Sequence, residues 1–179
     1  MLVDGRPLFE SAAIAEYVDE ISPGSLLPAE PIDRALNRAW IQFASNTLDA
    51  IGALYRAPDE LSLERAATVL DDRFGQLEGV LGHGPFFNGA GFSLVDAAFA
   101  PVFRYFDVLD RYVDFGLFDD RPRVTAWRGA LAGRAAVRAA VVADYAERLE
   151  HFLLERNARL SEHILNVELR WASKPSRVA

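Results

Sequence analysis

The chain has 179 residues, no cysteine, and a net charge of −7 from 26 acidic and 19 basic side chains. Apolar residues make up 51% of it, which excludes an intrinsically disordered protein. The acidic balance argues against nucleic acid or an anionic membrane as a partner, because both need a surface rich in Lys and Arg. Without cysteine, disulfides, thiolate metal sites and cysteine nucleophiles are excluded. No run of about eighteen apolar residues occurs, so we expect a cytoplasmic protein that does not span a membrane.

The N-terminal residues predict a β-hairpin followed by a helix. Asp4-Gly5 stands between the apolar pairs Leu2-Val3 and Leu8-Phe9, and glycine accepts the positive φ that a two-residue hairpin turn needs. Because a lone two-stranded hairpin is marginally stable, we interpret this one as the edge of a larger sheet. Ser11 can cap the following helix, whose apolar side chains recur on one helical face.

Two long amphipathic helices are predicted next. Residues 25–32 contain two prolines and form a linker. The first helix begins at Asp33 and ends near Tyr55, and the second is capped by Ser62 and continues to Leu81. The apolar stripe of the first helix consists of Leu36, Trp40, Phe43, Thr47, Ile51 and Leu54, and that of the second of Leu63, Ala66, Leu70, Phe74, Leu77 and Leu81.

The second half of the chain is also predicted to be helical. A glycine-rich loop at 82–91 precedes a third amphipathic helix, and a short helix lies around Trp127. A helical stretch begins near Ala135 and continues, with or without a break, to Ile164. We expect residues 173–179 to fray. The fold class is therefore mainly α, a helical bundle with a hairpin at its head.

Ser93 and Asp96 predict the start of the third helix. The Ser93 hydroxyl can accept a hydrogen bond from the Asp96 amide, while the Asp96 carboxylate accepts one from the Ser93 amide. This is a capping box with Asp in the place that Glu or Gln usually takes. We therefore assign both residues a structural role.

No pattern indicates a metal site or a hydrolase. The three histidines, His83, His151 and His163, have no spacing typical of zinc ligands and are interpreted as surface residues. No serine occupies a G-x-S-x-G turn. We predict neither a bound metal nor a Ser–His–Asp site.

Glu10 and Ser11 form the one polar pair with a plausible binding role. They stand at a strand-to-helix junction, where the free amides and the dipole of a helix N-terminus attract an anion. With Glu10 as partner for an ammonium group, the pair forms a receptor for one end of an amino acid. The alternative, in which Ser11 only caps the helix and Glu10 is solvated, is favoured by the residues alone.

Three segments together resemble the glutathione transferase family. The segment "RPLFESAAIAEYVDE" resembles the family's glutathione-binding strand–turn–helix, and "FFNGAGFSLVDAAFAP" is similar to the loop and capping box of its helical domain. The segment "RPRVTAWRGALAGRAAV" resembles the part that follows. Their order and spacing also agree, from Met1 to about Tyr145. Each motif is weak alone, and the three in register are specific.

The resemblance implies a division of the chain into domains. Residues 1–24 would be the remnant of a thioredoxin-like glutathione-binding domain, 25–32 the linker, 33–165 the all-helical C-terminal domain, and 166–179 a tail. Most of the thioredoxin-like domain would be missing before Met1. We expect either that translation starts upstream or that the gene is a remnant.

The resemblance also implies the site residues. Glu10 and Ser11 would bind the γ-glutamyl end of glutathione, Asp96 would serve folding, and Tyr105 would face the pocket for the electrophile. No residue matches the family's Tyr, Ser or Cys that stabilises the glutathione thiolate, so the catalytic residue stays unknown. Glutathione would be a co-substrate, with no further cofactor and no metal.

Three functions remain open. The first is conjugation of the glutathione thiol to small hydrophobic electrophiles by an extended, homodimeric form of the protein. The second is a non-catalytic dimerisation or interaction domain, since helical domains of this type also occur in translation-associated proteins. The third is passive binding of apolar ligands.

Overall fold

A computed structural model of the chain describes residues 1–172. Its N-terminal part is an antiparallel hairpin of β1 (Leu2–Val3) and β2 (Arg6–Pro7), followed by helix α1 (Ser11–Ile21). Asp4 and Gly5 at the turn both have positive φ, of 48° and 77°, which confirms the predicted two-residue turn. Within the described residues, the hairpin is the only sheet.

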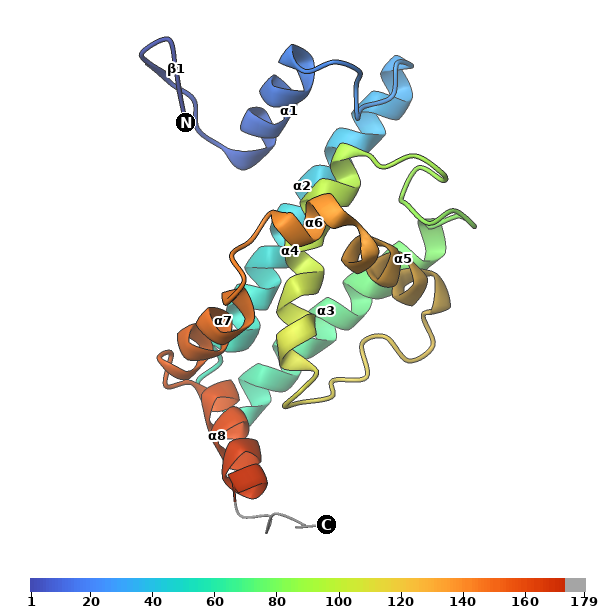
Figure 1. Cartoon of the computed structure of the whole chain (residues 1–179). Coiled ribbons are helices and arrows are strands. Elements are labelled where there is room, and N and C mark those ends of the chain that lie inside the picture. Colours follow the sequence, from blue (N-terminus) through green and yellow to red (C-terminus); the bar gives the residue numbers. More distant parts are fainter. Residues whose placement is uncertain (173–179) are drawn as a thin grey trace, which may run out of the picture.

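Seven helices follow in the described part of the chain, and the mainly α fold is confirmed. They are α2 (Pro31–Tyr55), α3 (Glu60–Val80), α4 (Leu94–Leu109), α5 (Pro122–Gly133), α6 (Ala135–Ala139), α7 (Tyr145–Leu154) and α8 (Arg159–Ala172). Figure 1 shows α4 in the middle of the bundle, with α2 and α3 along it and the hairpin and α1 at one end. Within residues 1–172, no helix is both long and apolar enough to cross a membrane.

The core forms around α4, because this helix is apolar on most of its surface. Its buried aromatic side chains Phe99, Phe103 and Phe106 contact Phe74 of α3 and Trp127 of α5. Trp127 is 1% exposed and Phe74 is fully buried. Large aromatic side chains bury more apolar area than any others, so these rings supply much of the hydrophobic stabilisation.

Asp96 is a fully buried carboxylate with four hydrogen-bond donors. One oxygen accepts from the Ser93 amide at 2.8 Å and the Ser93 hydroxyl at 2.6 Å. The Asp96 amide donates to the Ser93 hydroxyl oxygen at 3.4 Å, so the capping box is confirmed. The other accepts from the Phe87 amide at 2.9 Å and the Trp127 indole nitrogen at 2.6 Å. A buried carboxylate is tolerated only when its lone pairs are satisfied, and here donors from the glycine-rich loop, α4 and α5 satisfy them.

Two features of the long helices differ from the prediction. Asp59, and not Ser62, caps α3, because its carboxylate accepts the Ser62 amide at 2.8 Å and the helix begins at Glu60. Both residue types are good N-caps, so the helix start depends on which of the two adopts the extended cap conformation. Leu36 is also wrongly assigned to the buried stripe of α2, since it is 52% exposed. The stripe of α3, by contrast, is buried throughout as predicted.

The C-terminal stretch contains two breaks. Residues 140–144 separate α6 from α7, and Val141 and Val142 in this segment are β-branched and poor helix formers. Asn157 then takes a left-handed φ of 50° before α8. Helix α8 continues to Ala172, past residue 165, so residues 166–172, which were assigned to the tail, are helical. The expected fraying of 173–179 lies outside the described residues.

Replacement of Asp96 should destabilise the protein strongly. In Asp96→Ala, the Phe87 amide and the Trp127 indole lose their acceptor inside the core, and each unsatisfied buried donor costs about 1–3 kcal/mol. We expect a loss of roughly 3 kcal/mol or more, which lowers the melting temperature by about 6–12 °C. Thermal unfolding followed by circular dichroism measures this. The matched variant Asp49→Ala, at an exposed position of α2, should melt like the parent, and equal melting of both variants would refute the anchoring role.

Two replacements of Asp59 should distinguish the contribution of its capping hydrogen bond to stability from that of its charge. The Ser62 amide and, next, the Ser62 hydroxyl lower the pKa of Asp59, so its charge stabilises the fold above the unfolded-state pKa. That contribution is lost as the pH falls through the lower folded-state pKa, below about pH 4. Asp59→Ala should lower the melting temperature at neutral pH by roughly 2–4 °C. Asp59→Asn should keep the cap and melt with a shallower pH dependence below pH 4, whereas Asp72→Asn, exposed on the same helix, should follow the parent.

Candidate functional site

The junction between the hairpin and α1 is a strained, solvent-exposed corner. Glu10 has φ of 66° and ψ of 121°, a left-handed conformation that side chains other than glycine rarely adopt. Such a residue costs on the order of 1–3 kcal/mol and often marks a binding site. Glu10 and Ser11 are both exposed. The two side chains are therefore accessible to a ligand at the start of α1.

The N-terminus of α1 has no side-chain cap. Glu10 occupies the N-cap position, and no side chain accepts a hydrogen bond from the first-turn amides, so the prediction that Ser11 caps this helix is wrong. Ser11 is the first helical residue, and the earliest helical bond joins the Ile14 amide to the Glu10 carbonyl. The amides before Ile14 are left for solvent or for an anionic ligand.

Asp19 holds α1 against the helical bundle. It is 8% exposed, and its carboxylate accepts the Leu26 amide at 2.7 Å and the Ser25 hydroxyl at 2.8 Å. The Leu26 carbonyl in turn accepts the Leu94 amide at the start of α4, at 3.2 Å. This chain of hydrogen bonds connects α1, the linker and α4, and so fixes where the Glu10–Ser11 corner lies.

An ion pair adds a second connection between α1 and the bundle. The Arg38 guanidinium of α2 donates to both carboxylate oxygens of Glu16, with its shortest contact at 2.7 Å. Hydrogen bonding to Glu16 is the main cause that raises the pKa of Arg38. Because Arg38 is exposed, the pair orients α1 more than it stabilises the fold. Neither Asp19 nor this ion pair was identified from the sequence, since both depend on contacts between segments.

Tyr105 lies in an aromatic cluster between α2, α4 and α7. Its ring stacks on Tyr55 with centroids 6.1 Å apart and an interplanar angle of 14°, and Phe152 meets Tyr55 edge-on at 5.3 Å. The Arg56 guanidinium lies 5.1 Å from the centre of the Tyr55 ring. The three rings are partly buried against the core, so the cluster is mainly apolar.

Three tyrosines of the described chain have raised pKa values. Burial, followed by the nearby Tyr55 and Tyr145, raises the pKa of Tyr105 above its ordinary value. Burial also raises the pKa of Tyr145 and Tyr112. These hydroxyls stay protonated at neutral pH, so they can donate a hydrogen bond but cannot act as a base.

The structure does not bring the two predicted parts of the site together. No hydrogen bond or ring contact within residues 1–172 joins Glu10 or Ser11 to Tyr105. Tyr105 lies eleven residues along α4 from Leu94, or about 16 Å at the rise of a helix. The corner and the cluster are thus separate surfaces in this chain. Tyr55, the stacking partner, was not predicted as a site residue, and only its place at the end of a periodic helix hinted at it.

The histidines are scattered. His83 and His151 are exposed, whereas His163 is partly buried and lies 3.2 Å from the Glu60 carboxylate. In the described part of the chain, no three His, Asp or Glu side chains are placed to hold a metal ion. Ser93 and Asp96 lie in the core and are inaccessible to a ligand.

Comparisons with known proteins identify the family. The family model described as "Glutathione S-transferase, C-terminal domain" matches residues 60–130. The chain is 30% identical over 166 residues to "Probable glutathione S-transferase GSTU6" of Oryza sativa subsp. japonica, a match that covers 85% of this chain and 70% of that protein. It is 29% identical over 140 residues to "Probable glutathione S-transferase parC" of Nicotiana tabacum, covering 76% of this chain and 63% of the relative.

A solved structure agrees with these relatives. The crystal structure of rice GST1 in complex with glutathione superposes with a TM-score of 0.73 at 27% identity, over 87% of this chain and 74% of that one. The chain therefore belongs to the glutathione S-transferase family. It spans less than two thirds of the tobacco relative's length.

Loss of the Asp19 carboxylate should loosen α1 without unfolding the bundle. In Asp19→Ala, the Leu26 amide and the Ser25 hydroxyl lose their acceptor. We expect amide hydrogen exchange of residues 11–26 to become roughly tenfold faster, the effect of losing one hydrogen bond to a charged group. Exchange in α3 and α4 should not change. The neighbouring exposed residue provides the control Glu20→Ala, and equal exchange in both variants would show that Asp19 does not hold α1.

Proposed function

We propose that this protein, in a form that also carries a complete thioredoxin-like domain, conjugates the glutathione thiol to small hydrophobic electrophiles in the cytoplasm. Glutathione is the co-substrate, and neither a cofactor nor a metal takes part. Membership of the glutathione S-transferase family supports the reaction class. The observation that supports the site is the geometry of the Glu10–Ser11 corner.

The corner suits the γ-glutamyl end of glutathione, which carries one carboxylate and one ammonium group. The Ser11 hydroxyl and the open first-turn amides of α1 would donate to the carboxylate, and the Glu10 carboxylate would accept the ammonium. The positive φ of Glu10 supports this role, because strain of this kind persists where a ligand site requires it. Binding at this corner positions glutathione but does not activate its thiol.

Thiol activation requires a group that this chain does not supply. A thiol with a pKa of about 8.5 is only a few per cent ionised at neutral pH, so a transferase gains rate by stabilising the thiolate. The described tyrosines with shifted pKa values are all shifted upward and lie away from the corner. The aromatic cluster of Tyr55, Tyr105 and Phe152 would instead hold the electrophile beside the sulfur.

A homodimer belongs to the same proposal. Helices α2 and α3 carry large apolar side chains that are about half exposed, as at Leu36 (52%), Leu61 (56%) and Val69 (46%). Apolar groups gathered on adjacent helices mark interaction surfaces in many proteins. These two helices would pack on the thioredoxin-like domain of a second chain.

Glutathione binding tests the proposal directly. We expect weak or undetectable binding by calorimetry for the 179-residue chain, and tighter binding for a form extended at its N-terminus by a complete thioredoxin-like domain. In the extended form, Ser11→Ala should weaken binding by roughly 1.5–3 kcal/mol, as expected for a lost charge-assisted hydrogen bond. Ser22→Ala, the same change at the other end of α1, is the matched control and should have no effect.

The outcomes separate the functions that remained open. Conjugation activity that falls with Ser11→Ala but not with Ser22→Ala supports the transferase. An extended form that binds no glutathione, or binds it equally in both variants, contradicts the assignment of the corner and favours a non-catalytic interaction domain.

A further inference from the structure

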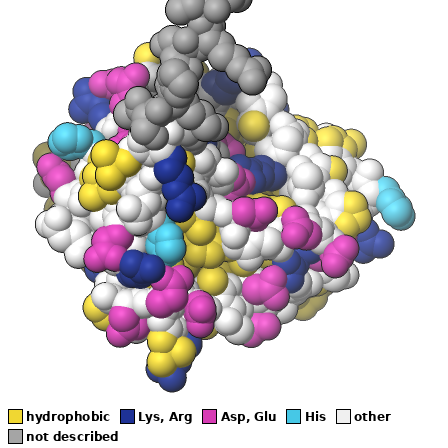
Figure 2. Space-filling model, turned by 90° about the horizontal axis from the view of Figure 1, so that it is seen from below, with side chains coloured by type: hydrophobic (Ala, Val, Ile, Leu, Met, Phe, Trp, Pro, Cys, Tyr) yellow, Lys and Arg dark blue, Asp and Glu magenta, His cyan; other side chains and the backbone are white. Residues whose placement is uncertain are grey.

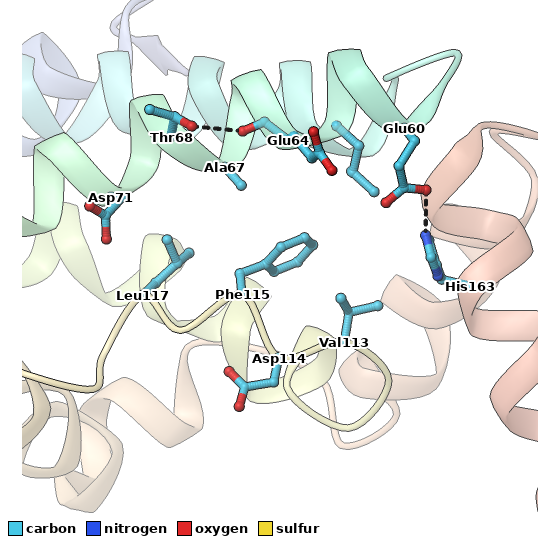
Figure 3. Close-up of a pocket in the computed structure, with 11 residues that line it drawn as sticks. Glu60, Glu64, Ala67, Thr68, Asp71, Val113, Asp114, Phe115, Leu117 and His163 are labelled. Atoms are coloured by element: carbon cyan, nitrogen blue, oxygen red, sulfur yellow. Dashed lines mark hydrogen bonds and ion pairs between the residues drawn. The ribbon is translucent and has the colours of Figure 1, made fainter.

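A hollow on the surface lies at the end of the bundle away from α1. It has a volume of about 470 Å³ and lies between α3, the segment 113–117 that follows α4, and α8. Figure 3 shows acidic side chains directed from α3 and, across from them on the loop, three apolar side chains with the acidic Asp114 beside them. We refer to it as the α3 groove. Its volume is in the range of sites for small organic molecules.

The apolar wall is built around an aromatic ring. Phe115 points toward α3, with Val113 and Leu117 on either side of it (Figure 3). Leu63 and Ala67 of α3 complete the apolar floor, and Phe115 is only partly buried against the core. A ligand with a flat or aliphatic body would cover this wall and remove its apolar surface from water.

The opposite wall is acidic. Glu60, Glu64 and Asp71 recur along one face of α3, and neither Lys nor Arg lines the groove. Arg121 pairs with Asp71 at 2.7 Å, and Arg159 and His163 both contact Glu60. Within residues 1–172, the Glu64 carboxylate has no ion-pair or hydrogen-bond partner. Glu64 therefore offers an unpaired negative charge to a ligand. Asp114 also lines the groove, and its carboxylate accepts the Gly116 amide at 2.9 Å.

The overall charge of the molecule also favours a cation. Figure 2 shows acidic side chains spread over the face seen from below, with Lys and Arg side chains and hydrophobic side chains between them. The whole chain has a net charge of −7. An anionic ligand would meet repulsion here, and a bare metal ion would find no set of three ligands in the described residues.

We propose that the α3 groove binds an amphipathic organic cation, a small molecule with an apolar body and one ammonium group. The body lies against Phe115, Val113 and Leu117, and the ammonium group lies beside Glu64. Charge complementarity selects the ammonium, and the apolar wall supplies binding that a simple inorganic cation cannot use. The Phe115 ring adds to the selection, because a cation near an aromatic face is attracted by its quadrupole.

Three probes of one shape test the charge preference. They are 2-(1-naphthyl)ethylammonium, 2-(1-naphthyl)ethanol and 1-naphthaleneacetate, each titrated into the 179-residue chain without glutathione and followed by ligand-detected NMR. We expect the ammonium to bind about three- to fivefold more tightly than the alcohol, as for an exposed ion pair, and the carboxylate to bind least tightly. Equal affinity for the three probes, or no detectable binding of the ammonium, overturns the proposal.

Matched variants locate the site. Glu64→Gln should remove the preference for the ammonium over the alcohol, while Glu147→Gln, an equal loss of charge at an exposed position of α7, should keep it. Ala67→Leu should weaken the binding of all three probes, because the larger side chain fills the groove. The melting temperature of this variant checks that it folds. If Ala67→Leu leaves the affinity for the probes unchanged, the probes bind elsewhere and the site is refuted. The same holds if Glu147→Gln changes the preference for the ammonium as much as Glu64→Gln does. Ser11→Ala is expected to have no effect, so this outcome is independent of the glutathione site.

Discussion

The buried carboxylate of Asp96 is the interaction on which the helical part of the molecule depends. Its four donors come from three places in the chain, namely the glycine-rich loop, the start of α4 and the middle of α5. Burial of a carboxylate in an apolar core costs free energy unless each oxygen accepts hydrogen bonds. The need for those donors therefore favours one arrangement of the surrounding segments. The central helix α4 can therefore begin at only one place relative to α5. The aromatic core of Phe74, Phe99 and Trp127 then packs in a single arrangement.

A second carboxylate that accepts hydrogen bonds from another segment, that of Asp19, positions the candidate glutathione site. Asp19 accepts a backbone amide and a hydroxyl from the linker, which is itself bonded to the start of α4. Two acidic side chains of α1 thus connect it to the rest of the molecule, Asp19 through the linker and Glu16 through its ion pair with Arg38 of α2. The strained Glu10–Ser11 corner lies at the far end of α1 from Asp19. This arrangement lets a strained binding corner be held by a stable bundle, because the two are linked by short hydrogen bonds and not by a flexible loop.

The distribution of charge distinguishes the two candidate ligand-binding surfaces. The corner at α1 offers unsatisfied amides and one carboxylate, which suits a zwitterionic group, whereas the α3 groove offers carboxylates above an apolar wall, which suits a cation. Figure 1 shows α1, which begins at the corner, and α8, which borders the groove, at opposite ends of the bundle. In the aromatic cluster of Tyr55 and Tyr105, burial raises the pKa of Tyr105, so this hydroxyl stays neutral. The fold therefore separates surfaces that differ in their electrostatics.

The sequence alone determined the features that depend on neighbouring residues. The turn at Asp4-Gly5, the capping box of Ser93 and Asp96, and the buried stripe of α3 all follow from local hydrogen bonding or helical periodicity, and the structure confirms them. At the start of α3, both Asp59 and Ser62 are residue types that can cap a helix, so the sequence allowed either one. The backbone conformation of the folded protein shows that Asp59 is the cap. The tertiary structure also decided the second pair of donors to Asp96, the anchoring by Asp19, the stacking of Tyr55 on Tyr105 fifty residues later, and the acidic groove. These depend on which surfaces meet when the helices pack, and side-chain spacing along one segment does not contain that information.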